Sequence, residues 1–328
     1  MVTDATTILV VGCGSIGKYH ARLLAERDDV QVWLCDILEE HLQAAKQVVP
    51  EARAFQDFDE ALAASPDAVF VCTPDAFHRP MAVSALEAGC DEFCEKPVAD
   101  TLESAEAIRD AAEAAPGMLQ VGYVLRCHPG IRKLNDMIAS GEIGNLVGAR
   151  ALVGAYYTLM RATTDQYLEA PNALVLGYTH QIDYLRLFLG EVVRVSAEAA
   201  TLGVLDMMPE PNVFSMLLRY RSGVIGEIHL DFVQHPQRHT LELYGDRKTA
   251  VLNTEAWQLS IFDRDQEGYQ EIPVPVARDE LYRTQIAAFL NSVRGDRVPI
   301  CSVNDGVAAV AVAEAAVRSS QEHCMIEL

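Results

Sequence analysis

The sequence lacks a long apolar run, a surplus of basic residues and a metal-type pairing of cysteines. No apolar stretch approaches the roughly 20 residues of a membrane-spanning helix, so we expect no membrane insertion. The formal net charge is −21. This argues against nucleic acid or an anionic membrane surface as a partner, because both are negatively charged. Only five of the 26 basic residues are lysines, so a lysine inside a motif is easy to notice.

The eight cysteines are scattered, and several lie in apolar, strand-like runs. We therefore expect buried thiols in a reducing compartment, the cytoplasm. Cys90 and Cys94 are not matched by a second pair, so we expect no metal site. The N-terminus runs into a first strand without a basic-then-apolar leader, so we do not expect secretion. At 328 residues the chain is long enough for two cores.

A glycine-rich turn follows the first apolar run. Residues 8–11 are four aliphatic residues, typical of a strand buried on both faces, and a helical stretch follows over residues 15–27. In this context Gly12 permits a tight turn, Gly14 lets a pyrophosphate approach the backbone, and Gly17 lets helix and strand pack closely. Ser15 and Ile16 begin the helix, whose free N–H groups attract phosphate.

An acidic residue stands where a ribose is usually bound. A second strand, residues 30–34, leads to Asp36, nineteen residues after Gly17. A carboxylate there accepts hydrogen bonds from ribose hydroxyls and repels a 2′-phosphate, which predicts NAD rather than NADP as cofactor. Glycine-rich turns also end helices and shape loops. The strand, the helix and the acid together favour dinucleotide binding.

The first half continues as alternating strands and helices, which predicts a doubly wound parallel sheet, the Rossmann fold. Further strands are expected at residues 54–55, 68–72, 91–94 and 118–123, and helices at 39–47, 59–64 and 80–88. Ligands lie at the carboxyl ends of such strands, so we expect Thr73, Pro74 and His78 near the nicotinamide half of the cofactor. Alternatively, Thr73 and Pro74 simply end the strand.

The strand at residues 91–94 leads to Glu95, Lys96 and Pro97. Proline keeps the preceding residue out of the helical region and allows a cis bond, so Lys96 is held at the strand end. An ammonium group there can hydrogen-bond a substrate hydroxyl and favour its alkoxide-like form. The alternative is an ordinary surface lysine.

The second half is expected to be an α+β domain with an open-faced, mostly antiparallel sheet. Helices are predicted at residues 130–139, 173–189, 279–293 and 305–319, and strands at 146–157, 213–220, 224–234, 239–244, 249–253 and 257–262. Residues 224–234 alternate between apolar and polar positions, as in a half-covered sheet. We place the boundary between a nucleotide-binding domain, residues 1–123, and a substrate-binding and oligomerisation domain, residues 124–328.

These motifs resemble the glucose–fructose oxidoreductase, inositol dehydrogenase and rhizopine-catabolism (Gfo/Idh/MocA) family. The resemblance covers essentially the whole chain and rests on four features: Gly12-Cys13-Gly14-Ser15-Ile16-Gly17, Thr73-Pro74, Glu95-Lys96-Pro97, and Gly122-Tyr123 with Arg126. It implies that Lys96 is the active-site lysine, with a cis bond to Pro97, and that Glu95 borders the cofactor. It also implies a homo-oligomer, a dimer or tetramer, that packs through the open sheet.

His180 is the histidine at the position of the family's Asp-x-x-x-His-x-x-Asp helix, and a histidine can serve as base with little tuning. The usual acid is absent, because Leu176 and Gly177 occupy the positions four and three residues before it. Asp183, one turn later, could replace that acid or be structural. A lone helical histidine is also often structural.

Substrate contacts are expected from Tyr123, Arg126 and Tyr157. Arg126 could hold a substrate phosphate or carboxylate, or pair with an acid of the protein. Other residues of the variable strand-and-loop region are further candidates: Tyr156, Arg161 and Tyr167. The residues His229, Asp231, His235 and His239 lack metal-ligand spacing, so we interpret them as a solvated face.

The sequence therefore predicts an NAD-dependent oxidoreductase that acts on a secondary alcohol of a sugar, cyclitol or sugar nucleotide. Lys96 would polarise the oxygen and His180 would transfer its proton. Two alternatives remain open: a redox-neutral epimerase or glycosidase-like enzyme that retains its cofactor, and a non-catalytic, nucleotide-responsive binding protein. Net release of NADH would exclude the redox-neutral enzyme, and turnover of any substrate would exclude the binding protein.

Overall fold

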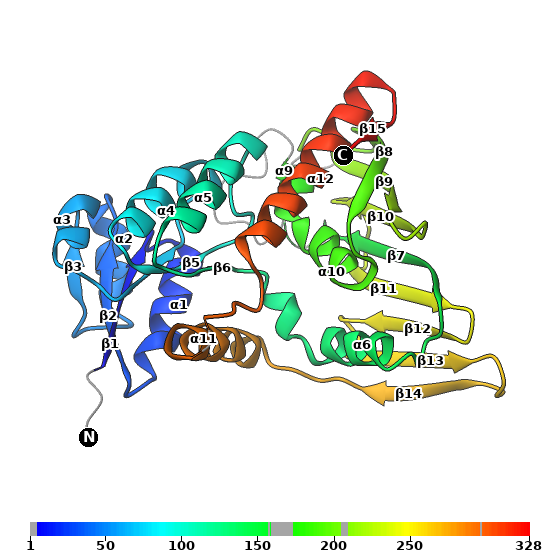
Figure 1. The fold of residues 1–328 in the computed structure, drawn as a ribbon, viewed down its shortest axis with the longest axis horizontal. Coiled ribbons are helices and arrows are strands. Elements are labelled where there is room, and N and C mark those ends of the chain that lie inside the picture. The colour runs from blue at the N-terminus through cyan, green and yellow to red at the C-terminus, as the bar shows by residue number, and fades with distance from the viewer. Residues whose placement is uncertain (1–4, 157, 159–172, 205–208, 296) are drawn as a thin grey trace. The chain divides into compact units, whose positions relative to one another are not determined.

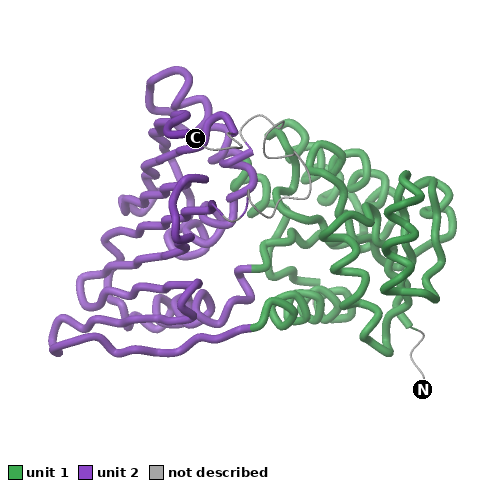
Figure 2. The backbone as a smooth tube through the Cα atoms, turned by 180° about the vertical axis from the view of Figure 1, so that it is seen from behind, with its two compact units in different colours: residues 1–124, 277–310 green, residues 125–276, 311–328 purple. Residues whose placement is uncertain are grey.

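The structure, a computed structural model, describes residues 5–156, 158, 173–204, 209–295 and 297–328. The chain forms two compact units, the first of residues 1–124 and 277–310 and the second of residues 125–276 and 311–328 (Figure 2). The first unit therefore includes a late segment of the chain besides the N-terminal part. Tyr157, Arg161 and Tyr167 lie outside the described residues.

The first unit is built on a six-stranded parallel sheet with the strand order β3-β2-β1-β4-β5-β6. This is the order of a dinucleotide-binding Rossmann fold. The strands are β1 (Thr6–Val11), β2 (Val30–Cys35), β3 (Arg53–Phe55), β4 (Ala68–Val71), β5 (Asp91–Cys94) and β6 (Leu119–Val121). The predicted parallel sheet is confirmed, because all five strand pairs of this sheet are parallel.

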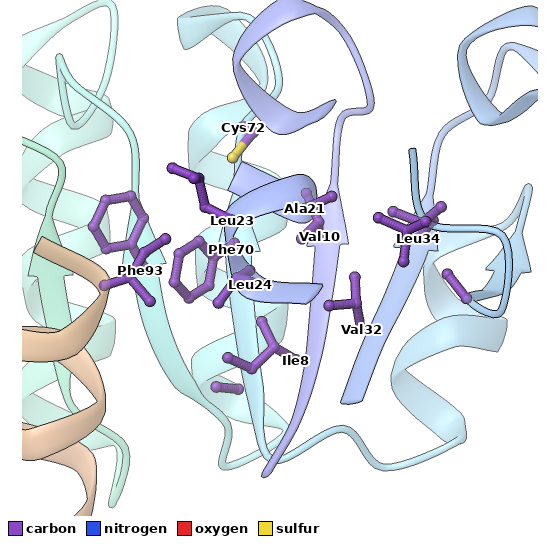
Figure 3. Close-up of a cluster of buried hydrophobic side chains, with 14 of the residues drawn as sticks. Ile8, Val10, Ala21, Leu23, Leu24, Val32, Leu34, Phe70, Cys72 and Phe93 are labelled. Atoms are coloured by element: carbon purple, nitrogen blue, oxygen red, sulfur yellow. The ribbon is translucent and has the colours of Figure 1, made fainter. Parts of the chain in front are cut away.

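Helices cover both faces of this sheet (Figure 1). They are α1 (Ser15–Ala25), α2 (Glu39–Lys46), α3 (Phe58–Ala63), α4 (His78–Glu87), α5 (Leu102–Ala114) and α11 (Arg278–Arg294), with short 3-10 turns at η1 (Asp75–Phe77) and η2 (Val124–Cys127). The core between the sheet and helices α1, α2 and α11 is aliphatic and aromatic (Figure 3). Phe70 and Phe93 stack with ring centroids 4.5 Å apart, and Phe289 of α11 meets Phe70 edge-on at 5.1 Å.

The second unit contains a nine-stranded sheet in which every pair is antiparallel except β7 with β10. Its strands are β7 (Leu146–Gly154), β8 (Val192–Ala200), β9 (Val213–Tyr220), β10 (Ile225–Asp231), β11 (Arg238–Gly245), β12 (Lys248–Asn253), β13 (Gln258–Asp263), β14 (Tyr269–Pro273) and β15 (Ile326–Glu327). The mostly antiparallel sheet is thus confirmed.

Within the described residues, helices cover one face of this sheet and leave the other open. Its helices are α6 (Pro129–Ala139), α9 (Ala173–Gly177), α10 (Thr179–Leu189) and the later part of α12 (Val303–Glu322), and α6, α9 and α10 pack on the strands. Along β10, Ile228 and Leu230 are buried, whereas Ile225 is 46% exposed, as the predicted alternation requires. Asp231 departs from that alternation and is buried.

Three sequence expectations are corrected by the structure. The strand predicted over residues 146–157 ends at Gly154. The helix predicted over residues 173–189 is two helices, because Tyr178 leaves the helical conformation with φ −112° and ψ 32°. The strand predicted over residues 224–234 ends at Asp231, whose carboxylate Oδ1 accepts hydrogen bonds from the backbone of Val233 and Gln234 and so forms a turn. No described helix combines the length and apolarity needed to cross a bilayer.

Candidate active site

The glycine turn between β1 and α1 is shaped by close backbone contacts. Gly12 has φ +86°, and a Cβ added to it would lie 2.6 Å from the backbone nitrogen of Thr73. A Cβ on Gly17 would clash with the carbonyl oxygen of Gly12. A Cβ on Gly14 would meet nothing within 4 Å. Gly12 and Gly17 are therefore required by packing, whereas the space beside Gly14 can admit a ligand.

The start of α1 has free hydrogen-bonding capacity. Gly14 is the N-cap residue and offers no side-chain cap, and the first turn contains no acidic residue. Ser15 is exposed and Ile16 partly exposed at this helix start. Close by, the buried Oγ1 of Thr73 has no hydrogen-bond partner in the part of the chain that the structure describes. Unpaired N–H groups and a buried hydroxyl fit the phosphates of a dinucleotide.

Asp36 lies at the end of β2 and is joined to the same turn. Its Oδ2 accepts the backbone N–H of Cys13 at 2.7 Å and lies 3.1 Å from Nδ1 of His41. Its Oδ1 accepts the backbone N–H of Leu38 at 2.9 Å. The carboxylate is therefore fixed beside the glycine turn, where it can bind ribose hydroxyls and disfavour a 2′-phosphate.

Lys96 follows β5 and forms a cis peptide bond with Pro97, as the family resemblance implies. Burial lowers the pKa of Lys96, and the carboxylates of Glu95 and Asp75 partly oppose this effect. His78 is 1% exposed. Its Nδ1 and Nε2 each lie 2.9 Å from a carbonyl oxygen, that of Pro97 and that of Thr73. His78 therefore joins the loop after β4 to the segment after Lys96, while Pro74 is exposed between them.

In the second unit, the structure brings Arg126 and Asp183 together. Arg126 Nε donates to Asp183 Oδ2 at 3.0 Å, and Nη2 donates to Oδ1 at 2.6 Å. Both side chains are nearly buried, at 8% and 2% exposure. Of the two roles weighed for Arg126, the geometry supports pairing with an acid of the protein. The carboxylate of Asp183 is correspondingly engaged.

The remaining predicted site residues range from fully buried to partly exposed. His180 is the second residue of α10 and is partly exposed. Tyr123, the residue before η2 in the first unit, is fully buried. Tyr156 meets the His235 ring at 5.4 Å. His229 Nδ1 lies 2.7 Å from Ser215 Oγ, and its Nε2 lies 3.3 Å from Asp231.

Sequence reasoning missed two histidines that are hydrogen-bonded near predicted site residues, His20 and His41, and it wrongly interpreted His239 as part of a solvated face. His20 Nε2 lies 2.8 Å from Glu95 Oε1, and His41 contacts Asp36 as described above. His239 Nε2 lies 2.9 Å from Nε2 of Gln181, the residue after His180. His20 had one signal, since it shares the buried stripe of α1 with Gly17 and Leu24. An imidazole on a buried helix face usually has a polar partner.

Comparison with known proteins agrees with this geometry. Residues 6–123 match the model of the oxidoreductase family with an NAD-binding Rossmann fold, and residues 131–251 match the GFO/IDH/MocA C-terminal domain. The chain belongs to the Gfo/Idh/MocA family. A 1,5-anhydro-D-fructose reductase of Ensifer adhaerens is 31% identical over 264 residues, covering 77% of this chain and 77% of the relative.

Other members of the Gfo/Idh/MocA family align over nearly the whole length. An inositol 2-dehydrogenase of Rhizobium meliloti is 28% identical over 97% of this chain and 98% of its own. Among solved structures, levoglucosan dehydrogenase in complex with NADH has a TM-score of 0.89 at 19% identity, covering 99% of both chains. This protein is thus an oxidoreductase with NAD as its cofactor, and the expectation of an enzyme is confirmed over that of a binding protein.

Proposed function

We propose that this protein is an NAD-dependent dehydrogenase that oxidises a secondary alcohol of a sugar or cyclitol, or reduces the corresponding ketone. The observation that carries the proposal is the glycine turn, with open space beside Gly14 and with Asp36 fixed next to it. Beside this turn lies the buried Thr73 hydroxyl, which has no hydrogen-bond partner among the described residues. Relatives named for anhydrofructose, apiose and inositol support the substrate class.

The first unit supplies the proposed cofactor site. Gly12, Gly14 and Gly17 with Ser15 and Ile16 would hold the pyrophosphate, and Asp36 the ribose. When bound, NAD accepts or returns the hydride. We assign His78 and Glu95 a supporting role, because their polar atoms are already bonded to the protein. Thr73 and Pro74 would border the cofactor.

Lys96 and His180 would act on the substrate oxygen. The ammonium group of Lys96 donates a hydrogen bond to that oxygen and stabilises the negative charge that develops on it. The imidazole of His180 accepts the hydroxyl proton in oxidation and returns it in reduction. Asp183, bound by Arg126, would keep α10 in place rather than exchange protons, and Tyr123 would support the site from within the core.

The test is a scan for NADH formation across polyols, sugars and sugar nucleotides, followed by Lys96→Ala on any active substrate. We expect loss of turnover by about a hundredfold or more, since the group acts on the reacting oxygen. Lys133→Ala, on the exposed surface of α6, is the matched control. Wild-type turnover in Lys96→Ala would overturn the assignment. Retention of NAD with product but no net NADH would indicate an epimerase instead.

We further propose that the open face of the nine-stranded sheet joins two copies of the chain, as a dimer or within a tetramer. This face mixes apolar groups with charges of both signs: Leu217 is 51% exposed, and Arg150 pairs with Glu227 at 3.0 Å. Such a surface can be self-complementary about a twofold axis. Sedimentation should show an oligomer that dissociates in Leu217→Arg and persists in Leu202→Arg, and a monomeric wild type would refute it. The eight cysteines, all of them described by the structure, form no disulfide bond, which supports a cytoplasmic location.

A further inference from the structure

The carboxylate of Glu95, the residue before Lys96, is held from helix α1. Nε2 of His20 lies 2.8 Å from Glu95 Oε1, and the backbone N–H of Lys96 donates to Glu95 Oε2 at 3.1 Å. His20 is 0% exposed and Glu95 is 7% exposed. The carboxylate therefore connects a buried imidazole to the peptide of the proposed catalytic lysine.

The His20 ring is enclosed by aromatic side chains. The ring centroids of Phe70, Phe93 and Tyr282 lie 5.5, 5.2 and 5.4 Å from that of His20, each in an edge-to-face arrangement. Within the described residues its Nδ1 has no hydrogen-bond partner, so Glu95 is the one polar group that the ring contacts there. The His20–Glu95 hydrogen bond is therefore shielded from solvent.

The backbone of Gly122 also lies close to Glu95. A Cβ added to Gly122 would lie 3.0 Å from Glu95 Cα and 3.1 Å from Oε2, so a larger residue there would displace the carboxylate. The hydrogen bond from His20 and the close backbone of Gly122 therefore both restrict the position of the carboxylate. The same carboxylate accepts the backbone N–H of Lys96, which ties it to the start of that residue.

The charges of these groups depend on one another. Burial raises the pKa of Glu95, but the hydrogen bond and charge of His20 and the charge of Lys96 outweigh it, and the net shift is downward. Burial lowers the pKa of Lys96, and Glu95 opposes that shift. An ionised Glu95 thus favours the ammonium form of Lys96, and His20 favours the ionised Glu95.

We propose that His20 is a positioning residue that, through Glu95, keeps Lys96 in its ammonium form. The inference rests on the proposed role of Lys96 as the donor to the substrate oxygen. The titratable and charged groups that surround this cluster within the first unit come from six elements and their ends: His20 of α1, Cys72 after β4, Asp75 of η1, His78 of α4, Cys94 and Glu95 at the end of β5, and Arg278 and Tyr282 of α11.

Two substitutions of His20 separate its hydrogen bond from its bulk. His20→Phe fills the aromatic enclosure but removes the donor, whereas His20→Gln places an amide N–H near the position of Nε2. In His20→Phe the pKa of Lys96 should fall, because a carboxylate without its donor protonates more readily. We expect the alkaline limb of the kcat/KM profile to move to lower pH by about one unit, and His20→Gln to restore it.

The titration of Lys96 can also be measured without turnover. Competitive labelling with acetic anhydride at a series of pH values, read by mass spectrometry of the peptide that contains Lys96, gives its pKa directly. Lys133 serves as the internal reference. We expect the labelling profile of Lys96, and not that of Lys133, to shift to lower pH in His20→Phe. An unshifted Lys96 profile in a folded His20→Phe would overturn the proposal.

If His20→Phe does not fold, Glu95→Gln provides the same test, because it keeps the shape of the side chain and removes its charge. Its Lys96 labelling profile should also shift to lower pH, and an unchanged profile would again overturn the proposal. Failure of the proposed function can be told apart from failure of the His20 proposal. If Lys96 had no catalytic role, Lys96→Ala would retain turnover, whatever the labelling profiles show.

Discussion

Arg126 holds Asp183 in a two-point ion pair, with Nε 3.0 Å from Oδ2 and Nη2 2.6 Å from Oδ1. The pair is nearly buried and joins the 3-10 turn η2 to helix α10, three residues after His180. The ion pair fixes the position of the Asp183 carboxylate on α10. Leu176 and Gly177 stand where the family has an acid, and Asp183 is the carboxylate one turn after His180.

Removing one partner of this pair should destabilise the second unit. Asp183→Ala leaves a buried guanidinium without its counter-charge, which typically costs about 3–5 kcal/mol. The double variant Arg126→Met/Asp183→Leu should regain much of that loss, because no charge remains to be desolvated. Urea unfolding of the three proteins measures both effects. If Asp183→Ala were as stable as the wild type but inactive, the carboxylate would belong to the chemistry instead.

The nucleotide-binding half was predictable because its signals are local. Four aliphatic residues before Gly12 specify a buried strand, and the spacing to Asp36 specifies the next one, so the parallel sheet follows from short-range patterns. Its completion by α11 was not predictable. The apolar stripe of residues 278–294 shows that this helix packs on something, but Phe289 meets Phe70 across more than two hundred residues.

In the candidate site, too, local features were predictable from the sequence and tertiary contacts were not. The glycine turn and Lys96 were predicted from motifs, and the structure gives them the expected backbone geometry. The pairing of Arg126 with Asp183, 57 residues apart, and of His20 with Glu95, 75 residues apart, depends on tertiary packing. Periodicity indicates which face of a helix is buried, but it does not indicate which polar side chain lies opposite.

The glycines of the turn should respond differently to alanine. Gly14→Ala should remain stable to within about 1 kcal/mol, since its φ is −64° and its new methyl group meets nothing within 4 Å. The methyl group would instead enter the space proposed for the pyrophosphate and raise the Kd for NAD by about tenfold or more, a change of about 1.4 kcal/mol. Calorimetric titration and thermal unfolding measure the two quantities.

Gly12→Ala is the matched comparison for that experiment. Its Cβ would lie 2.6 Å from the backbone of Thr73 at a φ of +86°, so the variant should lose stability before any ligand is added. Equal losses of stability in Gly12→Ala and Gly14→Ala would show that the space beside Gly14 is not a ligand site.

Glu92 of β5 should make the protein less stable as the pH rises. Burial raises its pKa from the ordinary 4.5 to about 8, and neither carboxylate oxygen has a hydrogen-bond partner among the described residues. Between these values the unfolded chain releases a proton that the folded chain retains. Stability should therefore fall by up to roughly 1.4 kcal/mol per pH unit over that range and level off above pH 8.

Glu92→Gln removes this titration and keeps the side-chain shape. Its free energy of unfolding should lose the downward slope between pH 5 and 8, so that the variant gains on the wild type as the pH rises. Glu87→Gln, at an exposed position of α4, should leave the slope unchanged. Parallel wild-type and Glu92→Gln curves in urea unfolding would mean that Glu92 is ionised in the folded protein.

His128 should weaken the second unit in acid. Its Nδ1 accepts the backbone N–H of Gly130 at 3.0 Å and so caps α6, which a ring protonated on both nitrogens cannot do. Burial lowers the pKa of His128 to about 4, and burial followed by the nearby His128 lowers that of His239 to about 4. Between pH 6.5 and 4 the unfolded chain takes up protons that the folded chain excludes. Stability should fall over that window and change little further below it.

His128→Asn tests this contribution, because asparagine keeps an acceptor at the N-cap and does not titrate. At pH 7 its free energy of unfolding should lie within about 1 kcal/mol of the wild type. At pH 4.5 the free energy of unfolding of His128→Asn should exceed that of the wild type, because the variant no longer has the titration of His128. The difference should be up to roughly 1.4 kcal/mol for each pH unit of that titration. His323→Asn, at an exposed position, should follow the wild-type curve throughout. If His128→Asn lost stability equally at both pH values, the imidazole would contribute through packing, such as its stacking on Trp257 with centroids 6.4 Å apart, and not through its protonation.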